Sequence, residues 1–314
     1  MEPRTNSFKQ GALGLIGHTA LVALDRVHTG PGRVFGKAEF LQPGGSVKDR
    51  AARAIIQGAR TDGCLRPGQT VVTMTSGNFG AGLAVVCALL GHPFVATMST
   101  GNSPERAKMM RAFGAEVVQV PQVDGSQGRV TGADISAADV VARQIAKERD
   151  AFYVDQFNDK YSVIAHQEGT GPELWEQLAG KIDGFVACVG SGGTFVGTAR
   201  FLKKQARAIV CAAVEPEGAE VLAGKSVTKP DHLLQGTSYG RVPPCWDPQL
   251  IDLSISVSDD EAQEWRDRLA KLEGLYVGFS AAANVLAAVK LLQSGRVRPD
   301  GTVVTILCDT GLKY

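Results

Sequence analysis

Several features that would point to a particular class of protein are absent from this chain of 314 residues. Its six cysteines, at positions 64, 87, 188, 211, 245 and 308, include no CxxC pair, so we expect small core residues and no metal site. No apolar run approaches the roughly 18 residues of a membrane span, and "MEPRTNSFKQ" is unlike a signal peptide. These absences predict a cytoplasmic protein.

An excess of charge of one sign is also missing. Lys and Arg number 33 and Asp and Glu 32, which gives a net charge of +1. This balance offers no electrostatic argument for binding nucleic acid or an anionic membrane. Small molecules are therefore the expected ligands.

What the chain has in abundance is strand-length apolar runs that alternate with longer amphipathic stretches. From residue 70, "TVVTM", "FVATM" and "EVVQV" alternate with "GAGLAVVCALLG" and "PERAKMMRAFG", and a second series runs from "GFVACVG" to "TVVTILC". Continuously apolar strands with helices between them predict an α/β fold with two open, mainly parallel sheets flanked by helices. Two such units imply a cleft between them, and the long polar loops at residues 121–134 and 216–248 are typical of binding loops.

The stretch "LQPGGSVKDRAARAII", residues 41–56, places Lys48 in the first turn of a predicted helix. Residues 43–45 form a turn, Ser46 can cap the helix, and Asp49 three residues later fits a capping box. The positive end of a helix disfavours the charged form of an ammonium group. Lys48 is therefore either a solvated lysine, as most lysines are, or a nucleophile.

Polar segments follow three of the predicted strands, and ligands in open α/β sheets bind outside the carboxyl ends of strands. The segments are "TSGNFG" at residues 75–80, "GSGGTFVG" at residues 190–197 and "CDTGLKY" at residues 308–314. Small residues let backbone N–H groups face an anion at a helix N-terminus, and the second segment suits a single phosphate. A lysine and a phosphate loop in one cleft are the combination expected for pyridoxal phosphate.

Two alternatives remain for the glycine-rich segment. Such turns between a strand and a helix can serve tight packing alone. A dinucleotide site is the other alternative, because Glu215 ends the next strand, where a ribose-binding acid would lie. Phe195, however, occupies the place of the third glycine in GxGxxG.

In their order and spacing, "PGGSVKDR", "TSGNFG", "GSGGT" and "CDTG" resemble the cysteine synthase (O-acetylserine sulfhydrylase) and cystathionine β-synthase family of fold type II pyridoxal-phosphate enzymes. The likeness begins at "IGHTALVAL", which is similar to the family's IGNTPL, and covers nearly the whole chain. It implies a fold like that of the tryptophan synthase β-subunit, with the cofactor in the cleft between two domains.

The resemblance implies a role for each matching residue. Lys48 matches the lysine that forms the Schiff base and removes the substrate Cα proton. Asn78 matches the residue that bonds the pyridine 3′ oxygen, and Thr310 matches the hydroxyl that faces the pyridine nitrogen. The residues that match the phosphate loop are Gly190, Ser191, Gly192, Gly193 and Thr194.

The resemblance also implies a set of substrate-binding residues. Thr75, Ser76 and Gln156 match residues that contact the substrate carboxylate. The other residues of the set are Gly77 and Phe79 and, on the closing loop "QGTSYG", Gly236 and Tyr239. Phe79 departs from the family, since most sulfhydrylases have threonine there. It either reshapes the substrate pocket or only packs.

The activity that the resemblance implies is β-replacement on an activated L-serine, with O-acetyl-L-serine and sulfide giving L-cysteine and acetate as the leading hypothesis. O-phosphoserine as the donor, or homocysteine or an amine as the nucleophile, as in cystathionine or diaminopropionate-type synthases, are alternatives within the same chemistry. A catalytically weakened homologue that works as a binding protein is an alternative of another class.

The assembly implied by the resemblance is a homodimer. Each chain would have a smaller mobile domain at residues 45–150, and a larger, phosphate-binding domain at residues 1–44 and 151–314. The tail of a serine acetyltransferase is a further partner that the resemblance suggests.

Overall fold

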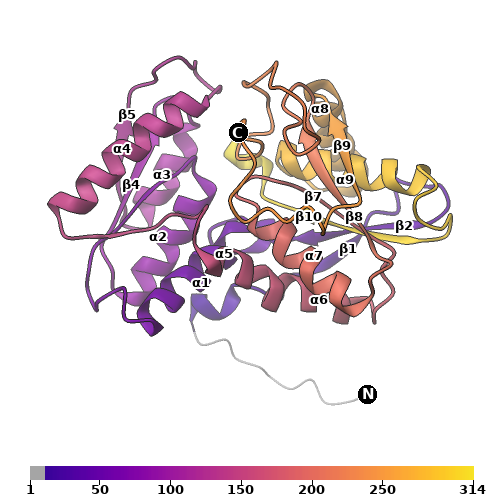
Figure 1. Ribbon diagram of the computed structural model, residues 1–314, viewed down its shortest axis with the longest axis horizontal. Coiled ribbons are helices and arrows are strands. Elements are labelled where there is room, and N and C mark those ends of the chain that lie inside the picture. Colours follow the sequence, from indigo (N-terminus) through magenta and orange to yellow (C-terminus); the bar gives the residue numbers. More distant parts are fainter. Residues whose placement is uncertain (1–10) are drawn as a thin grey trace.

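The computed structural model describes residues 11–314 and contains two sheets, each at the centre of its own lobe (Figure 1). In the larger sheet the strand order is β1-β2-β10-β7-β8-β9, and of these six strands only β1 runs antiparallel to its neighbour. The strands are β1 (Leu21–Ala23), β2 (Arg33–Ala38), β7 (Gly184–Cys188), β8 (Val210–Pro216), β9 (Leu253–Val257) and β10 (Thr302–Leu307).

The smaller sheet is parallel throughout, in the order β5-β4-β3-β6. Every residue of β3 and β4 is buried, as expected for strands covered on both faces. Its strands are β3 (Val71–Met74), β4 (Phe94–Ser99), β5 (Glu116–Val120) and β6 (Phe152–Tyr153). The predicted fold class is confirmed.

Nine α-helices cover the two sheets in the described residues. The first four lie around the smaller sheet in Figure 1, and α9 is almost wholly buried against β7 and β10. The helices are α1 (Lys48–Thr61), α2 (Asn78–Leu90), α3 (Pro104–Ala112), α4 (Gly132–Glu148), α5 (Lys160–Ala165), α6 (Gly171–Gln177), α7 (Gly193–Gln205), α8 (Asp259–Arg268) and α9 (Phe279–Gln293). The domain boundaries stay a prediction, although β6, just beyond residue 150, pairs with β3 of the smaller sheet.

A buried ionic network fixes α1, the helix that begins at Lys48, against the larger lobe. The Arg50 guanidinium donates to Glu39 through Nε at 2.7 Å and to Glu173 through Nη1 at 2.6 Å. Lys37 on β2 adds a second cation, 2.7 Å from Glu173. Opposite charges hold the pKa of Glu173 down at about 2 despite its burial, so both carboxylates stay paired and α1 keeps its place.

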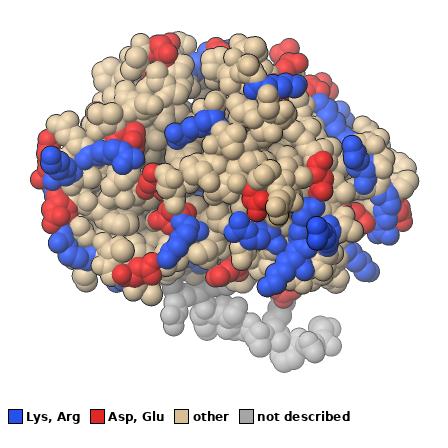
Figure 2. All heavy atoms as spheres, in the orientation of Figure 1, with Lys and Arg blue, Asp and Glu red and all other residues tan. Residues whose placement is uncertain are grey.

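The molecular surface follows the balanced composition. On the face that Figure 2 shows, basic and acidic side chains are interspersed over both lobes. Within residues 11–314, no helix combines the length and the apolar character needed to cross a membrane.

Candidate active site

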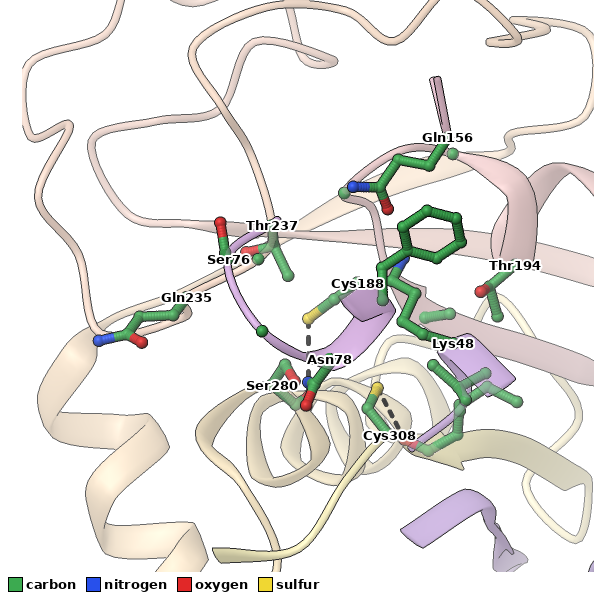
Figure 3. Close-up of a pocket in the computed structure, with 18 of the residues that line it drawn as sticks. Lys48, Ser76, Asn78, Gln156, Cys188, Thr194, Gln235, Thr237, Ser280 and Cys308 are labelled. Atoms are coloured by element: carbon green, nitrogen blue, oxygen red, sulfur yellow. Dashed lines mark hydrogen bonds between the residues drawn. The ribbon is translucent and has the colours of Figure 1, made fainter. Parts of the chain in front are cut away.

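The candidate active site is a pocket between the two lobes, where four helices begin (Figure 3). Its lining includes Lys48 from the start of α1, Asn78 from the start of α2, Thr194 from the start of α7 and Ser280 from the start of α9. The first turns of helices carry free N–H groups and partial positive charge. Because four such ends converge, the pocket is suited to an anionic ligand.

Lys48 is the first residue of α1, and its amine reaches across to the larger lobe. Its Nζ lies 3.4 Å from Oγ of Ser191. Burial lowers the pKa of Lys48, so the neutral amine is accessible. The predicted capping box is wrong, because the carboxylate of Asp49 accepts from the N–H of Gly44 instead, while Ser46 Oγ accepts only a 3.3 Å bond from the Lys48 N–H.

The loop between β7 and α7 is shaped by glycines. A Cβ at Gly190 would overlap the carbonyl oxygen of Gly236, and Gly192 has a φ of +91°, which disfavours other residues. A Cβ at Gly193 would collide with the Ser162 carbonyl. The backbone therefore runs close to its neighbours and presents the open N-terminal turn of α7 to the pocket.

His166, which was not assigned a role from the sequence, contacts Thr194 in the first turn of α7. Its Nε2 lies 3.2 Å from Oγ1 of Thr194, and its Nδ1 lies 2.9 Å from Oγ1 of Thr170. Burial holds the pKa of His166 well below its ordinary value, so the ring is neutral. His166 thus positions the Thr194 hydroxyl, in a contact that sequence spacing could not reveal.

Arg106 of α3 holds the loop between β3 and α2 in place. Arg106 donates through Nη1 to the Ser76 carbonyl at 2.8 Å, and a Cβ at Gly77, whose φ is +130°, would overlap the arginine side chain. Thr75 Oγ1 accepts 3.0 Å bonds from the N–H groups of Gly77 and Gly80. Its hydroxyl hydrogen is then left for another acceptor.

Asn78 has its side-chain amide fixed at both ends by the C-terminal segment. Its Nδ2 donates to Oδ2 of Asp309 at 2.7 Å, and its Oδ1 accepts from Nζ of Lys313 at 2.9 Å. Tyr314 donates its hydroxyl to the same Asp309 oxygen at 2.9 Å. The amide therefore has one orientation, with its second N–H available to a ligand.

Thr310 is not among the residues that line the pocket, and its expected role toward the cofactor stays a prediction. Its hydroxyl accepts a 3.2 Å bond from the Leu312 N–H in the turn that follows β10. Ser280, which the sequence analysis did not select, lines the pocket from the first turn of α9. The stretch "GFSAAAN" alone could not assign a role to Ser280, because the contact depends on how α9 packs against β7 and β10.

All seven residues expected to contact substrate are brought together. Thr75, Ser76, Gly77, Phe79, Gln156, Gly236 and Tyr239 all line the pocket. Phe79 is also buried in the core of the smaller lobe, so it both packs and shapes the pocket. The closing loop is strained at Ser238, a non-glycine residue with a φ of +41°.

The cysteines are free and only partly follow the expectation of small core residues. Cys87 and Cys211 are buried as expected, whereas Cys64 is exposed. Cys188 and Cys308 line the pocket. Cys308 begins the segment "CDTGLKY" that was expected at the cleft, whereas Cys188 was not expected there. Burial raises the pKa of Cys308 to about 12, so its thiol stays protonated at neutral pH.

The acidic residue on which the dinucleotide alternative depends, Glu215, is occupied by contacts within the protein. Glu215 is buried, and its carboxylate accepts bonds from the N–H groups of Leu222 and Ala223 and from the Ser254 hydroxyl. These three bonds tie the carboxylate to the following loop and to β9, so Glu215 has a structural role here. The glycine loop therefore serves a single phosphate better than a dinucleotide.

Pyridoxal phosphate fits the residues present. An amine with a lowered pKa lies next to a glycine-shaped loop at a helix N-terminus, and Asn78 offers an oriented N–H group in the same pocket. The lysine suits the aldehyde of the cofactor, and the loop suits its phosphate.

Comparison with known proteins agrees with this fit. The profile of the pyridoxal-phosphate dependent enzyme family matches residues 12–309, and the chain belongs to that family. It is 39% identical to a cysteine synthase of Staphylococcus aureus over 96% of this chain and 93% of the relative. The chain is thus a pyridoxal-phosphate-dependent enzyme.

Solved structures give the same fold. An O-acetylserine-dependent cystathionine β-synthase from Helicobacter pylori superposes with a TM-score of 0.88 at 31% identity, over 98% of this chain and 97% of that one. An O-ureido-L-serine synthase superposes with a TM-score of 0.86 at 34% identity, over 99% and 94%. The expected fold type II architecture is confirmed.

Proposed function

We propose that this enzyme carries out β-replacement on O-acetyl-L-serine with sulfide as the nucleophile, giving L-cysteine and acetate. The observation that carries the proposal is the Lys48 amine, 3.4 Å from Ser191 of the phosphate loop, in a pocket where four helix N-termini converge. The similarity to a cysteine synthase over nearly the full chain supports it.

Each residue of the pocket has a task in this proposal. Bound pyridoxal phosphate supplies the electron sink for bond cleavage at the substrate. The N–H groups of residues 190–194 would hold its phosphate, and the free N–H of Asn78 would bond its ring oxygen. The Ser280 hydroxyl, in the first turn of α9, would be a second candidate beside Thr310 for the partner of the ring nitrogen.

The substrate is bound on the opposite side by the loop after β3. Thr75, with its two lone pairs already used, donates its hydroxyl hydrogen to the substrate carboxylate, together with Ser76 and Gln156. Lys48 removes the Cα proton, because its lowered pKa leaves the amine free to accept it. Acetate then departs from Cβ and the sulfur adds there.

O-Phosphoserine is the second candidate donor, and Arg106 is the observation that favours it. This arginine lines the pocket, is only 2% exposed, and its Nε and Nη2 have no hydrogen-bond partner among the described residues. A buried guanidinium with free N–H groups is a site for an anionic group.

The test is the visible absorption spectrum of the purified protein before and after each donor, followed by sulfide. We expect a coloured protein whose spectrum changes with O-acetylserine and returns on adding sulfide, with cysteine as the product. A change with O-phosphoserine alone would transfer the proposal to that donor. Colour that responds to neither donor would favour the binding homologue.

The assembly proposed is a homodimer, on the basis of the family resemblance, with closure of the smaller lobe and binding of a serine acetyltransferase tail as further proposals. Sedimentation of the purified protein, alone and with a synthetic acetyltransferase tail, tests both interactions. A mass of one chain at all concentrations would exclude the dimer.

A further inference from the structure

A second cavity opens directly off the candidate active site. Ser76, Gln235, Gly236, Thr237 and Tyr239 line both cavities. Most of the remaining wall comes from the loop before α4 with the first turn of that helix, and from the loop after β8. These are the two long loops that the sequence marks as binding loops. Asn102, in the turn between β4 and α3, completes the wall. We call this second cavity the side chamber.

The two loops that form the side chamber are tied together across the lobes. Gln235 donates through Nε2 to the Gly128 carbonyl at 2.6 Å. Arg129 donates to the side chain of Asp231 at 2.9 Å and to its carbonyl at 2.5 Å. A ligand in the side chamber is therefore held between elements of both lobes.

The chemistry of the side chamber differs from that of the active site. None of the described residues that line it is Asp, Glu, Lys or Arg. His232, only 8% exposed, is neutral because burial lowers its pKa. Val130, Ile135 and Val227 give the wall an apolar part.

Two polar atoms at the side chamber lack partners. Nδ1 of His232 and Oε1 of Gln235 are buried and have no hydrogen bond to any residue in the range 11–314. An unpaired buried polar atom destabilises the folded protein, so a ligand with an O–H or N–H donor would be favoured there. A carboxylate or ammonium group would lose its hydration without finding an opposite charge.

We propose that the side chamber binds the second reactant, and that this reactant can be a small neutral thiol carrying a hydroxyl or amide group, in preference to a free amino acid. The inference rests on the proposed β-replacement. Overall, a C–S bond at Cβ replaces the C–O bond, acetate leaves with the bonding electrons, and the thiol proton is released. Sulfide reacts in the active site without occupying the side chamber.

The test compares three nucleophiles with O-acetylserine as the donor: sulfide, 2-mercaptoethanol and homocysteine. For the wild type we expect kcat/KM with 2-mercaptoethanol to exceed that with homocysteine by about tenfold or more. The variant Val130→Trp fills the side chamber, and should lower kcat/KM for 2-mercaptoethanol by about tenfold while leaving sulfide unchanged. The matched control is Val123→Trp, on the same loop but 65% exposed and outside the side chamber, which should change neither rate.

A second variant guards against a folding defect in the first. His232→Phe removes the unpaired Nδ1 together with the long, 3.4 Å contact of Nε2 with the Ser238 carbonyl. It should raise KM for 2-mercaptoethanol without changing turnover of sulfide. Equal rates with homocysteine and 2-mercaptoethanol, or equal slowing of sulfide and 2-mercaptoethanol in both variants, would overturn the inference.

The result with sulfide separates this inference from the proposed function. Turnover with sulfide but not with 2-mercaptoethanol refutes only the side chamber. Turnover with 2-mercaptoethanol but not with sulfide supports the side chamber and refutes sulfide as the nucleophile. No turnover with any of the three would overturn both.

Discussion

Asn78 and Lys313 are joined by a 2.9 Å hydrogen bond, although 235 positions separate them in the sequence. The bond links the first residue of α2 to the turn after β10, and Lys313 also donates to the Gly44 carbonyl at 2.8 Å. The C-terminal segment thus sets both the amide of Asn78 and the turn that precedes Lys48. Substitutions in this segment should therefore alter the positions of Asn78 and Lys48 in the pocket.

Lys313 should make stability depend on pH. Burial lowers its pKa from 10.5 to about 8, so between these values the unfolded chain binds more protons than the folded chain. The free energy of unfolding from this group therefore rises with pH across that window. Relative to Lys313→Met, the wild type should gain up to about 3 kcal/mol from pH 8 to pH 10.5 in urea unfolding.

The control for this prediction is Lys271→Met, which changes an exposed lysine. It should run parallel to the wild type across the same range. A difference between wild type and Lys313→Met that does not vary with pH would show that Lys313 titrates as in the unfolded chain.

Replacing Lys48 should abolish catalysis. Lys48→Ala removes both the amine that binds the cofactor and the base that takes the Cα proton, so we expect turnover to fall by about a thousandfold or more. The cofactor should also be lost on dialysis, as followed by absorption. Lys108→Ala, at a side chain 81% exposed, is the control, and comparable turnover in both variants would exclude the assigned role.

Ser280 and Thr310 can be separated directly. Ser280→Ala should weaken cofactor binding and shift the visible spectrum, because its hydroxyl lines the pocket. Thr310→Ala should leave the spectrum unchanged and cost about 1 kcal/mol of stability, since it removes only the cap on the Leu312 N–H. Spectral titration with the cofactor decides, and the reverse pattern would support the role expected for Thr310.

Phe79 should matter for stability as well as for substrate choice. Phe79→Thr removes a large side chain from the core of the smaller lobe, at a cost of about 3 kcal/mol. The ratio of kcat/KM for O-acetylserine and O-phosphoserine should also change, because the ring lines the pocket. Leu89→Thr, exposed on the same helix, is the control; an unchanged ratio would leave Phe79 with a packing role alone.

Arg50 should be among the most sensitive residues outside the pocket. Arg50→Met leaves Glu39 and Glu173 buried without their shared cation and should cost about 3–5 kcal/mol, measured by urea unfolding. Arg60→Met, at an exposed position near the end of α1, should cost less than about 0.5 kcal/mol. Similar losses in the two variants would mean that the network contributes little.

The sequence was sufficient where local pattern determines structure. The apolar runs of β3, β4, β7 and β10 form the centres of the two sheets, and the loops that follow β3 and β7 reach the pocket as expected. The strands β1 and β2 were not predicted, because β1 is only three residues long and β2 includes Arg33 and Lys37. Lys37 can be buried because its ammonium group is paired with Glu173 and also donates to the Thr19 carbonyl and to Gln177.

The sequence was insufficient where a contact joins distant elements. Ser280 reaches the pocket because α9 packs against β7 and β10 of the larger sheet. His166, in the helical turn that follows α5, contacts Thr194 in α7. The spacing of Asp49 fitted a capping box. In the structure, however, the turn before Asp49 brings the Gly44 N–H close enough to donate to the Asp49 carboxylate. Tertiary geometry decided each of these cases.

The position of β10 has a consequence for how the chain is made. This strand lies between β2 and β7 in the larger sheet, yet it follows both in sequence. During synthesis on the ribosome, β1 and β2 must therefore wait, with one edge unpaired, until β10 emerges to join them to β7. All four strands of the smaller sheet have been synthesised once residue 153 is added, so this sheet can form first. The pocket is then completed as one of the last events of biosynthesis.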